Sequence, residues 1–245
     1  MDSSQVPLPN RPASPKRGLS TIVLVAITLL LGMPFAIVTI VLQNPKMPNI
    51  VLGTKTIDAG PSGTKTVKIG LLTGPNDANL AGAYIAIGAT AITTLALWRF
   101  RGSSRDLYLK IWGWSLLGTG LANLVGQFAC LVYIFIVSSQ YPQAKSTDEV
   151  PRLDNGQYDA QGKVYSKESW ACMMNKLYPQ YEGSWAGKAC DDMTIARYMA
   201  IPLTIVSILL LCLALWQVQL KGGLSWLLGK KRVPAMTQSK DFIPM

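Results

Sequence analysis

The stretch IWGWSLLGTGLANLVGQFACLVYIFIV, residues 111–137, decides how the rest of this chain is interpreted. It contains no charged side chain and exceeds the ~20 residues that cross a bilayer as a helix. Two ridges of small and polar residues recur every four positions and would form one continuous helical face. They are Gly118, Ala122, Gly126 and Cys130, and Ser115, Thr119, Asn123 and Gln127. Because lipid requires only apolar bulk, this face predicts a helix on which other helices pack.

Three further segments are long and apolar enough to span a membrane, namely residues 18–43, 80–98 and 196–220. The chain is 49% hydrophobic and its mean hydropathy is positive, as is typical of an integral membrane protein. The first segment is too long for the apolar core of a secretory signal peptide, so we interpret it as a retained helix. The predicted fold class is all-α transmembrane: a four-helix membrane bundle with a small extracytoplasmic α+β cap.

Polar residues within these segments favour helix packing. The ridge of the second helix consists of Gly82, Ala86, Thr90 and Thr94, and we expect it to pack on the small face of the third helix. Asn123 and Gln127 are the only strongly polar pair at depth. Either they line a polar site or conduction path, or they hydrogen-bond to Thr90, Thr94 or Thr28 at ~0.6–2 kcal/mol each. We favour the packing interpretation, because the four segments contain essentially no ionisable residue.

The two longer polar stretches, residues 44–79 and 138–195, supply the cap. Residues 49–57 and 64–72 are rich in Val, Ile, Leu and Thr and flank a Gly-Pro turn at 59–63, which predicts a β-hairpin. In the second stretch, residues 158–166 suggest another small hairpin. Ser166 then has the character of an N-cap for a short helix that carries Cys172.

The distribution of charged residues predicts the orientation of the chain in the membrane. The tails, residues 1–17 and 221–245, and the link 99–110 hold twelve cations and three anions, whereas the two longer stretches, counted with Arg197 at the edge of the fourth segment, hold the other eleven cations and ten anions. The positive-inside rule places both tails and the link in the cytoplasm. The net charge of +10 is therefore a topology signal, and we expect no nucleic-acid partner. The N-terminal tail is rich in Pro and Ser and is predicted to be disordered.

The same orientation predicts one disulfide. Cys172 and Cys190 would face an oxidising compartment and are expected to pair, whereas Cys130 and Cys212 would remain thiols in the apolar segments. The short closed loop corresponds to roughly 3 kcal/mol in the chain-entropy model. The alternative is that Cys172 and Cys190 are free thiols, and a reversed orientation in the membrane would favour this alternative.

The residue types and their spacing give little support for catalysis or for cofactor binding. The chain has no His, no CxxC and no metal-ligand spacing, so we expect neither enzyme activity nor a cofactor or metal site. Carboxylates of the second polar stretch, namely Glu168, Glu182, Asp191 and Asp192, could suggest acid–base catalysis or a cation site, but Asp191 and Asp192 beside a helix start are explained more simply by favourable helix-dipole placement. Arg197, at the edge of the fourth segment, is expected to extend to the membrane interface.

Aromatic residues of the second polar stretch are the candidates for contacts with other proteins. They are Tyr165, Trp170, Tyr178, Tyr181 and Trp185. Tyr and Trp are common at protein contact sites and at membrane interfaces. The alternative is that these side chains form the small core of the cap, and both interpretations can hold together.

This plan of four helices, cytoplasmic tails and a disulfide-bearing outer region resembles claudin-like and tetraspanin-like proteins in topology alone. The Trp and Cys residues typical of a claudin-like first loop are absent from residues 44–79, and Cys172 and Cys190 stand outside the Cys-Cys-Gly of tetraspanins, so no functional residue is carried over.

We expect a tetraspan-type organiser, adhesion or scaffold protein in the plasma membrane or a secretory-pathway endomembrane. Its partners would be lipids and other membrane proteins or itself. The alternative is an accessory subunit of a transporter, channel or membrane-enzyme complex.

Overall fold

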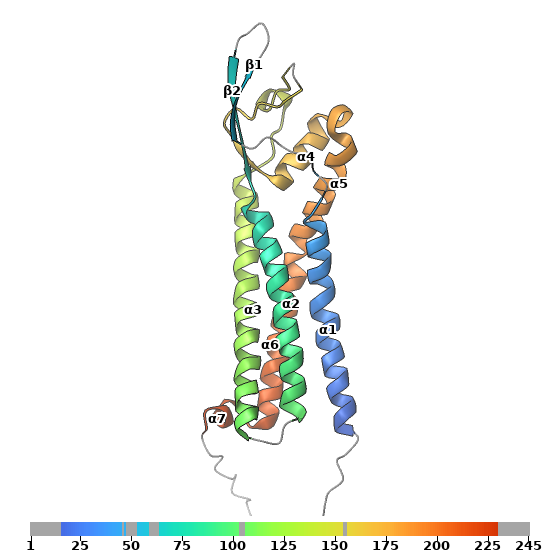
Figure 1. The fold of residues 1–245 in the computed structure, drawn as a ribbon, viewed down its shortest axis with the longest axis vertical. Helices are drawn as coiled ribbons and strands as arrows, with labels where there is room; N and C mark the ends of the chain where they lie inside the picture. Colours follow the sequence, from blue (N-terminus) through green and yellow to red (C-terminus); the bar gives the residue numbers. More distant parts are fainter. Residues whose placement is uncertain are drawn as a thin grey trace, which may run out of the picture.

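Four long helices form a bundle that carries a small cap at one end (Figure 1). The computed structural model of the chain describes residues 16–45, 47, 53–58, 64–102, 106–153 and 156–229. The predicted tails at 1–15 and 230–245 and the predicted turn at 59–63 lie outside these residues. The chain begins its first helix and ends its last one at the end of the bundle opposite the cap (Figure 1).

The bundle consists of α1 (Lys16–Leu42), α2 (Gly74–Gly102), α3 (Asp106–Gln140) and α6 (Ala200–Lys221). By length and composition, four helices are apolar enough to cross a membrane, as the sequence predicts. The second helix begins at Gly74 rather than at residue 80. Pro75 and Asp77 lie in its first turn, where a missing N–H and a negative charge are both favourable. α2 packs along both α1 and α3.

The fourth apolar helix continues into the cap. α5 (Pro179–Tyr198) runs into α6 with a break only at Met199. Pro202 explains the break, because it has no N–H for the carbonyl of Tyr198 and its ring crowds that carbonyl. One side chain of α2 meets the break: Asn79 Nδ2 donates to the Ala196 carbonyl at 2.7 Å.

The buried stripe of α3 follows alternating steps of three and four residues, which is the spacing of a coiled-coil contact. It consists of Leu109, Gly113, Leu116, Gly120, Asn123, Gln127, Ile134 and Val137. α6 shows the same pattern at Ala200, Leu203, Ser207, Leu210, Ala214 and Gln217. Gly120 faces Leu211, and Leu116 packs with Leu97 and Ala214. The helices therefore meet along heptad-like stripes.

The cap combines strands and short helices. β1 (Gly53–Asp58) and β2 (Thr64–Leu72) form the antiparallel hairpin expected from the sequence. β3 (Val164–Ser166) pairs with β2 in parallel, so the predicted hairpin at 158–166 is wrong. Tyr158 instead bridges Arg152, while a turn at 160–163 leads into β3. η2 (Thr147–Glu149) and α4 (Lys167–Leu177) complete the cap.

At the opposite end, α7 (Gly223–Leu227) folds back against the bundle. The chain reverses at Gly222 and Gly223, whose φ values of 131° and 73° are readily adopted only by glycine. Leu227 is buried over Gly113, and Trp226 meets Phe100 edge-to-face at 6.2 Å. The end of α6 is thereby closed by apolar contacts.

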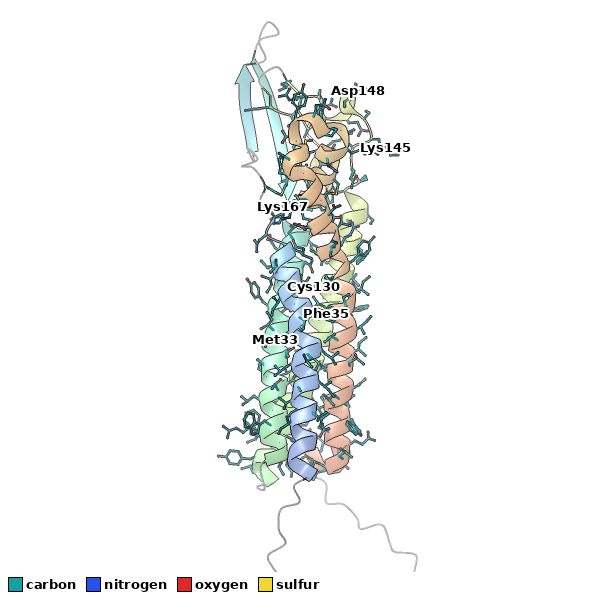
Figure 2. All side chains as sticks on the ribbon, turned by 90° about the vertical axis from the view of Figure 1, so that its right-hand side faces the viewer. Met33, Phe35, Cys130, Lys145, Asp148 and Lys167 are labelled. Atoms are coloured by element: carbon teal, nitrogen blue, oxygen red, sulfur yellow. A yellow bond between two sulfur atoms is a disulfide. The ribbon has the colours of Figure 1, made fainter. Side chains whose placement is uncertain are left out.

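The exterior of the bundle is apolar. Figure 2 places Met33, Phe35 and Cys130 midway along the helices, whereas Lys145 and Asp148 lie in the cap. Large apolar side chains such as Leu30 and Val125 are more than half exposed. An exterior of this kind is unfavourable in water, since soluble proteins rarely expose contiguous apolar surfaces so large.

Candidate functional site

The predicted disulfide is present, and it joins the two helices on which the cap is built. Cys172 of α4 is bonded to Cys190 of α5, and their Cα atoms are 4.6 Å apart. Cys130 and Cys212 are free thiols. Ser166 caps α4 as expected, because its Oγ accepts the N–H of Ser169 at 3.0 Å. The beginning of α4 is thus fixed by its cap and its middle by the disulfide.

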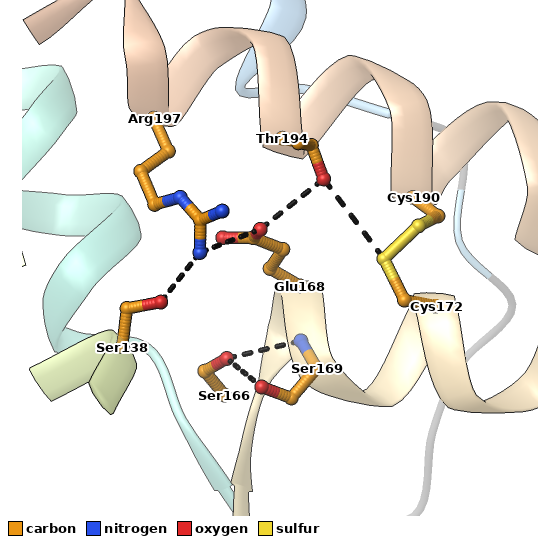
Figure 3. Close-up of a disulfide and its surroundings, with 8 residues drawn as sticks. All are labelled: Ser138, Ser166, Glu168, Ser169, Cys172, Cys190, Thr194 and Arg197. Atoms are coloured by element: carbon orange, nitrogen blue, oxygen red, sulfur yellow. Dashed lines mark hydrogen bonds and ion pairs between the residues drawn. A yellow bond between two sulfur atoms is a disulfide. The ribbon is translucent and has the colours of Figure 1, made fainter. Parts of the chain in front are cut away.

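A polar cluster lies beside the disulfide where the cap meets the bundle (Figure 3). We call it the junction cluster: Ser138, Glu168, Thr194 and Arg197. Arg197 Nη1 lies 3.1 Å from Glu168 Oε1 and donates to Ser138 Oγ at 2.5 Å. Thr194 Oγ1 donates to the same carboxylate oxygen of Glu168 at 3.2 Å. Three helices, α3, α4 and α5, meet in this cluster.

Burial sets the electrostatics of the junction cluster. The side chains of Arg197 and Glu168 are only 21% and 15% exposed. Burial raises the pKa of the Glu168 carboxyl, and the Arg197 charge and the Thr194 hydrogen bond partly oppose that rise. Arg197 was expected to extend to the interface, but it turns inward to Glu168, a carboxylate that the sequence did not pair with it.

Three of the five aromatic contact candidates lie in the core of the cap. Tyr165, Trp170 and Tyr178 are at least 93% buried. Trp170 meets Tyr165 at 6.1 Å between ring centroids, and Tyr178 Oη donates to the Val150 carbonyl at 2.7 Å. These residues therefore supply the apolar centre of the cap, which is the alternative that the sequence left open.

The other two candidates are more accessible. Tyr181 is exposed, and the Arg152 guanidinium stacks 3.8 Å from its ring centroid. Trp185 is partly buried against the cap core, and its Nε1 donates to Glu182. Glu182 also accepts the hydroxyl of Tyr158 at 2.9 Å. The Trp185 ring is thus fixed from the side of the core.

The polar pair of α3 is satisfied inside the chain. Gln127 Nε2 donates to the backbone carbonyl of Gly82 at 2.6 Å and lies 3.5 Å from Asn123 Oδ1. Both side chains are almost fully buried. The partner is a carbonyl of α2 rather than one of the threonines that the sequence suggested. Gly82 allows this approach, because a Cβ there would lie 3.3 Å from Gln127 Oε1.

The remaining ridge of α2 faces α1. Thr94 Oγ1 lies 3.2 Å from Thr28 Oγ1, and Ala86 packs with Ala36 in a buried cluster. Thr90 lies directly against Gly32, so that a Cβ added to Gly32 would overlap its Oγ1. The Thr90 hydroxyl is buried with no hydrogen-bond partner among the described residues. This ridge, expected to serve α3, mainly brings α1 and α2 together.

The four-residue ridge of α3 lies partly on the outside of the bundle. Gly118 and Ala122 are exposed, and a Cβ added to Gly118 would meet nothing within 4 Å. Gly126 is half-buried against Ile85. We call the exposed residues Gly118, Ala122, Val125 and Ala129 the outer face of α3. The described part of the chain leaves this face uncovered.

A cleft of about 530 Å³ lies between the end of α1 and α5. Val41 and Leu42 form part of its apolar wall, and Ser184, Lys188 and Asp192 form its polar wall. Sequence reasoning missed this cleft, because its two walls are more than 130 positions apart in the chain. Among the described residues, no group of three or more His, Cys, Asp or Glu side chains is arranged to hold a metal ion.

Comparison with known proteins gives no match: no protein-family model, no curated protein and no solved structure matches this chain.

Proposed function

We propose that this chain is an integral membrane protein whose cap lies outside the cytoplasm and whose termini lie inside it. The apolar exterior of the four helices supports insertion. Exposed aromatic residues gather near both ends of the helices, as in membrane proteins. They are Tyr84, Tyr133 and Tyr198 toward the cap, and Trp98, Tyr108, Trp114 and Trp216 toward the other end.

The orientation rests on charge and on the disulfide. The tails and the link carry a net charge of +9 and the two cap segments, counted with Arg197, carry +1, which favours a cytoplasmic location for the tails. The Cys172–Cys190 bond belongs to the cap, and disulfides persist in extracytoplasmic compartments. The plasma membrane and the secretory-pathway endomembranes meet both conditions.

Within that membrane, the protein acts as a non-enzymatic organiser or scaffold through lateral helix contacts and contacts of the cap. The outer face of α3 carries this proposal, because its small side chains allow a second helix to approach closely. The bundle does not need this face for its own packing, since Asn123 and Gln127 are satisfied on another side of α3. On the cap, Tyr181 is the exposed aromatic that a partner would meet.

The second candidate is an accessory subunit of a transporter, channel or membrane enzyme. The same outer face of α3 would then pack on a different protein. The two candidates differ in the composition of the complex, since an organiser associates with itself or with varied partners, and an accessory subunit forms a hetero-complex of fixed stoichiometry.

Complex mass in mild detergent tests this proposal. Gly118→Leu places a bulky side chain on the outer face and is expected to shift the native complex to the mass of the single chain. Gly88→Leu is the matched control, because Gly88 is an exposed helical glycine of α2 with nothing within 4 Å of an added Cβ. Unchanged mass in Gly118→Leu would refute lateral association through α3. A hetero-complex of fixed stoichiometry would favour the accessory subunit.

A further inference from the structure

The cleft between α1 and α5 lies where an apolar helix end meets a polar helix. The apolar span of α1 ends at Leu42, and the cleft is bounded there by Val41 and Leu42. Across from them lies a segment of α5 with two charged residues. With a volume of about 530 Å³, the cleft has the size of small-molecule sites, which run from ~300 to 1,000 Å³.

The polar wall presents one positive and one negative charge in a fixed order. Ser184, Lys188 and Asp192 are spaced by four residues and lie in one row on α5. Neither Lys188 nor Asp192 forms an ion pair or a side-chain hydrogen bond with any residue that the structure describes. Both charges are therefore available to a ligand.

The aromatic part of the wall is held in place from behind. Trp185 lines the cleft, and its Nε1 is bound to Glu182, which in turn accepts the hydroxyl of Tyr158 in the cap core. The indole adds an apolar surface to the cleft, one turn of α5 away from Lys188. The indole is thus positioned before any ligand binds.

We propose that this cleft binds the headgroup of a zwitterionic phospholipid. Lys188 would contact the phosphate, Asp192, one turn further along α5, the ammonium group, and Trp185, Val41 and Leu42 the beginning of an acyl chain. Charge favours a zwitterion over an anionic lipid, because the described wall of the cleft carries one lysine and one aspartate. The inference rests on the proposed membrane insertion, which places the end of α1 at headgroup level.

Native mass spectrometry of the full chain tests the site. The delipidated protein in mild detergent is titrated with dioleoyl phosphatidylethanolamine. Lys188→Gln and Asp192→Asn should each weaken retention of this lipid about tenfold, the effect of losing one charge-assisted contact. Lys176→Gln and Asp191→Asn are matched controls at exposed residues that do not line the cleft, and their retention should equal that of the wild type.

Two further probes identify what the cleft recognises. Dioleoyl phosphatidic acid lacks the amine, and glycerophosphoethanolamine lacks the acyl chains, so both should bind at least about tenfold more weakly than the complete lipid. Equal affinity for phosphatidic acid would overturn the zwitterion assignment, and equal affinity for the soluble headgroup would overturn the lipid assignment. Equal losses in the cleft and control variants would show that the lipid binds elsewhere. Release of the chain from membranes at alkaline pH would separately refute insertion.

Discussion

Arg197 and Glu168 form an ion pair, with Nη1 and Oε1 3.1 Å apart, that joins the helix entering the bundle to the first helix of the cap. Both side chains are largely buried; Ser138 accepts a hydrogen bond from Arg197 and Thr194 donates one to Glu168, while Arg197 Nε has no partner among the described residues. A buried pair contributes little net stability over an apolar pair, but the loss of one member leaves a charge without compensation. The junction is therefore sensitive to the removal of either side chain.

Replacement of Arg197 by Met should lower the free energy of unfolding by about 1–3 kcal/mol, because Glu168 would stay buried without its cation. Thermal unfolding in detergent measures the loss. Lys163→Met is the matched control, since Lys163 pairs with Glu149 at the exposed surface of the cap and its loss should change little. Equal destabilisation by the two variants would contradict the assignment of the buried pair.

The pH dependence of stability should carry the signature of Glu168. Burial raises its pKa in the folded state, so the native protein holds this proton more tightly than the unfolded chain does. Its contribution to the free energy of unfolding is fully present at low pH and declines as pH rises above the ordinary value of 4.5. The stability difference between the wild type and Glu168→Gln should therefore fall as pH rises above about 4.5. A difference that rises with pH would contradict this sign.

Gly32→Ala tests the close approach of α1 and α2. A Cβ there overlaps Thr90 Oγ1 and lies 2.9 Å from Thr90 Cβ, so we expect about 1–3 kcal/mol of destabilisation from overpacking. Adding Thr90→Ala should restore only part of this loss, because the Cβ contact remains. Gly88→Ala is the control, since its site is open and alanine favours the helix by ~0.5–1 kcal/mol. If Gly32→Ala left the free energy of unfolding unchanged, α1 and α2 could move apart at little cost, which would contradict this close packing.

Loss of the disulfide should destabilise the cap. Cys172 and Cys190 are 18 positions apart, and opening a loop of that size costs roughly 3 kcal/mol in the chain-entropy model. Cys190→Ser should lower the unfolding temperature and abolish the mobility change that reduction causes on a denaturing gel. Cys212→Ser, at a free exposed thiol, should do neither. A mobility change that persists in Cys190→Ser would indicate a different pairing.

The sequence predicted the helices and the disulfide because each depends on a local pattern or on compartment chemistry. Apolar length marks the four helices, and Ser166 marks the beginning of α4. The face of α3 that is buried was harder to predict. A step of four residues made Gly118 and Ala122 seem central, whereas the helix buries a stripe with alternating steps of three and four. Leu116, which belongs to neither of the two small and polar ridges, is fully buried in that stripe.

Contacts between distant segments were beyond the reach of the sequence pattern. The pairing of β3 with β2 joins residues more than 90 positions apart, and hydrophobic alternation marks a strand without naming its neighbour. The hydrogen bond from Asn79 to the Ala196 carbonyl could not be predicted either, because a polar residue just before an apolar run is interpreted as part of a loop. The junction cluster could not be predicted without the three-dimensional structure, because Ser138, Glu168 and Arg197 come from three different helices.

The single-residue break at Met199 makes α5 and α6 nearly one rod that runs from the cap through the bundle. On this side, no flexible linker separates the cap from the bundle. The disulfide and the Arg197–Glu168 ion pair also join α4 to this nearly continuous helix. A lateral load on the cap would be transmitted along α6 as tilt or rotation, with Pro202 as the place where the rod can bend.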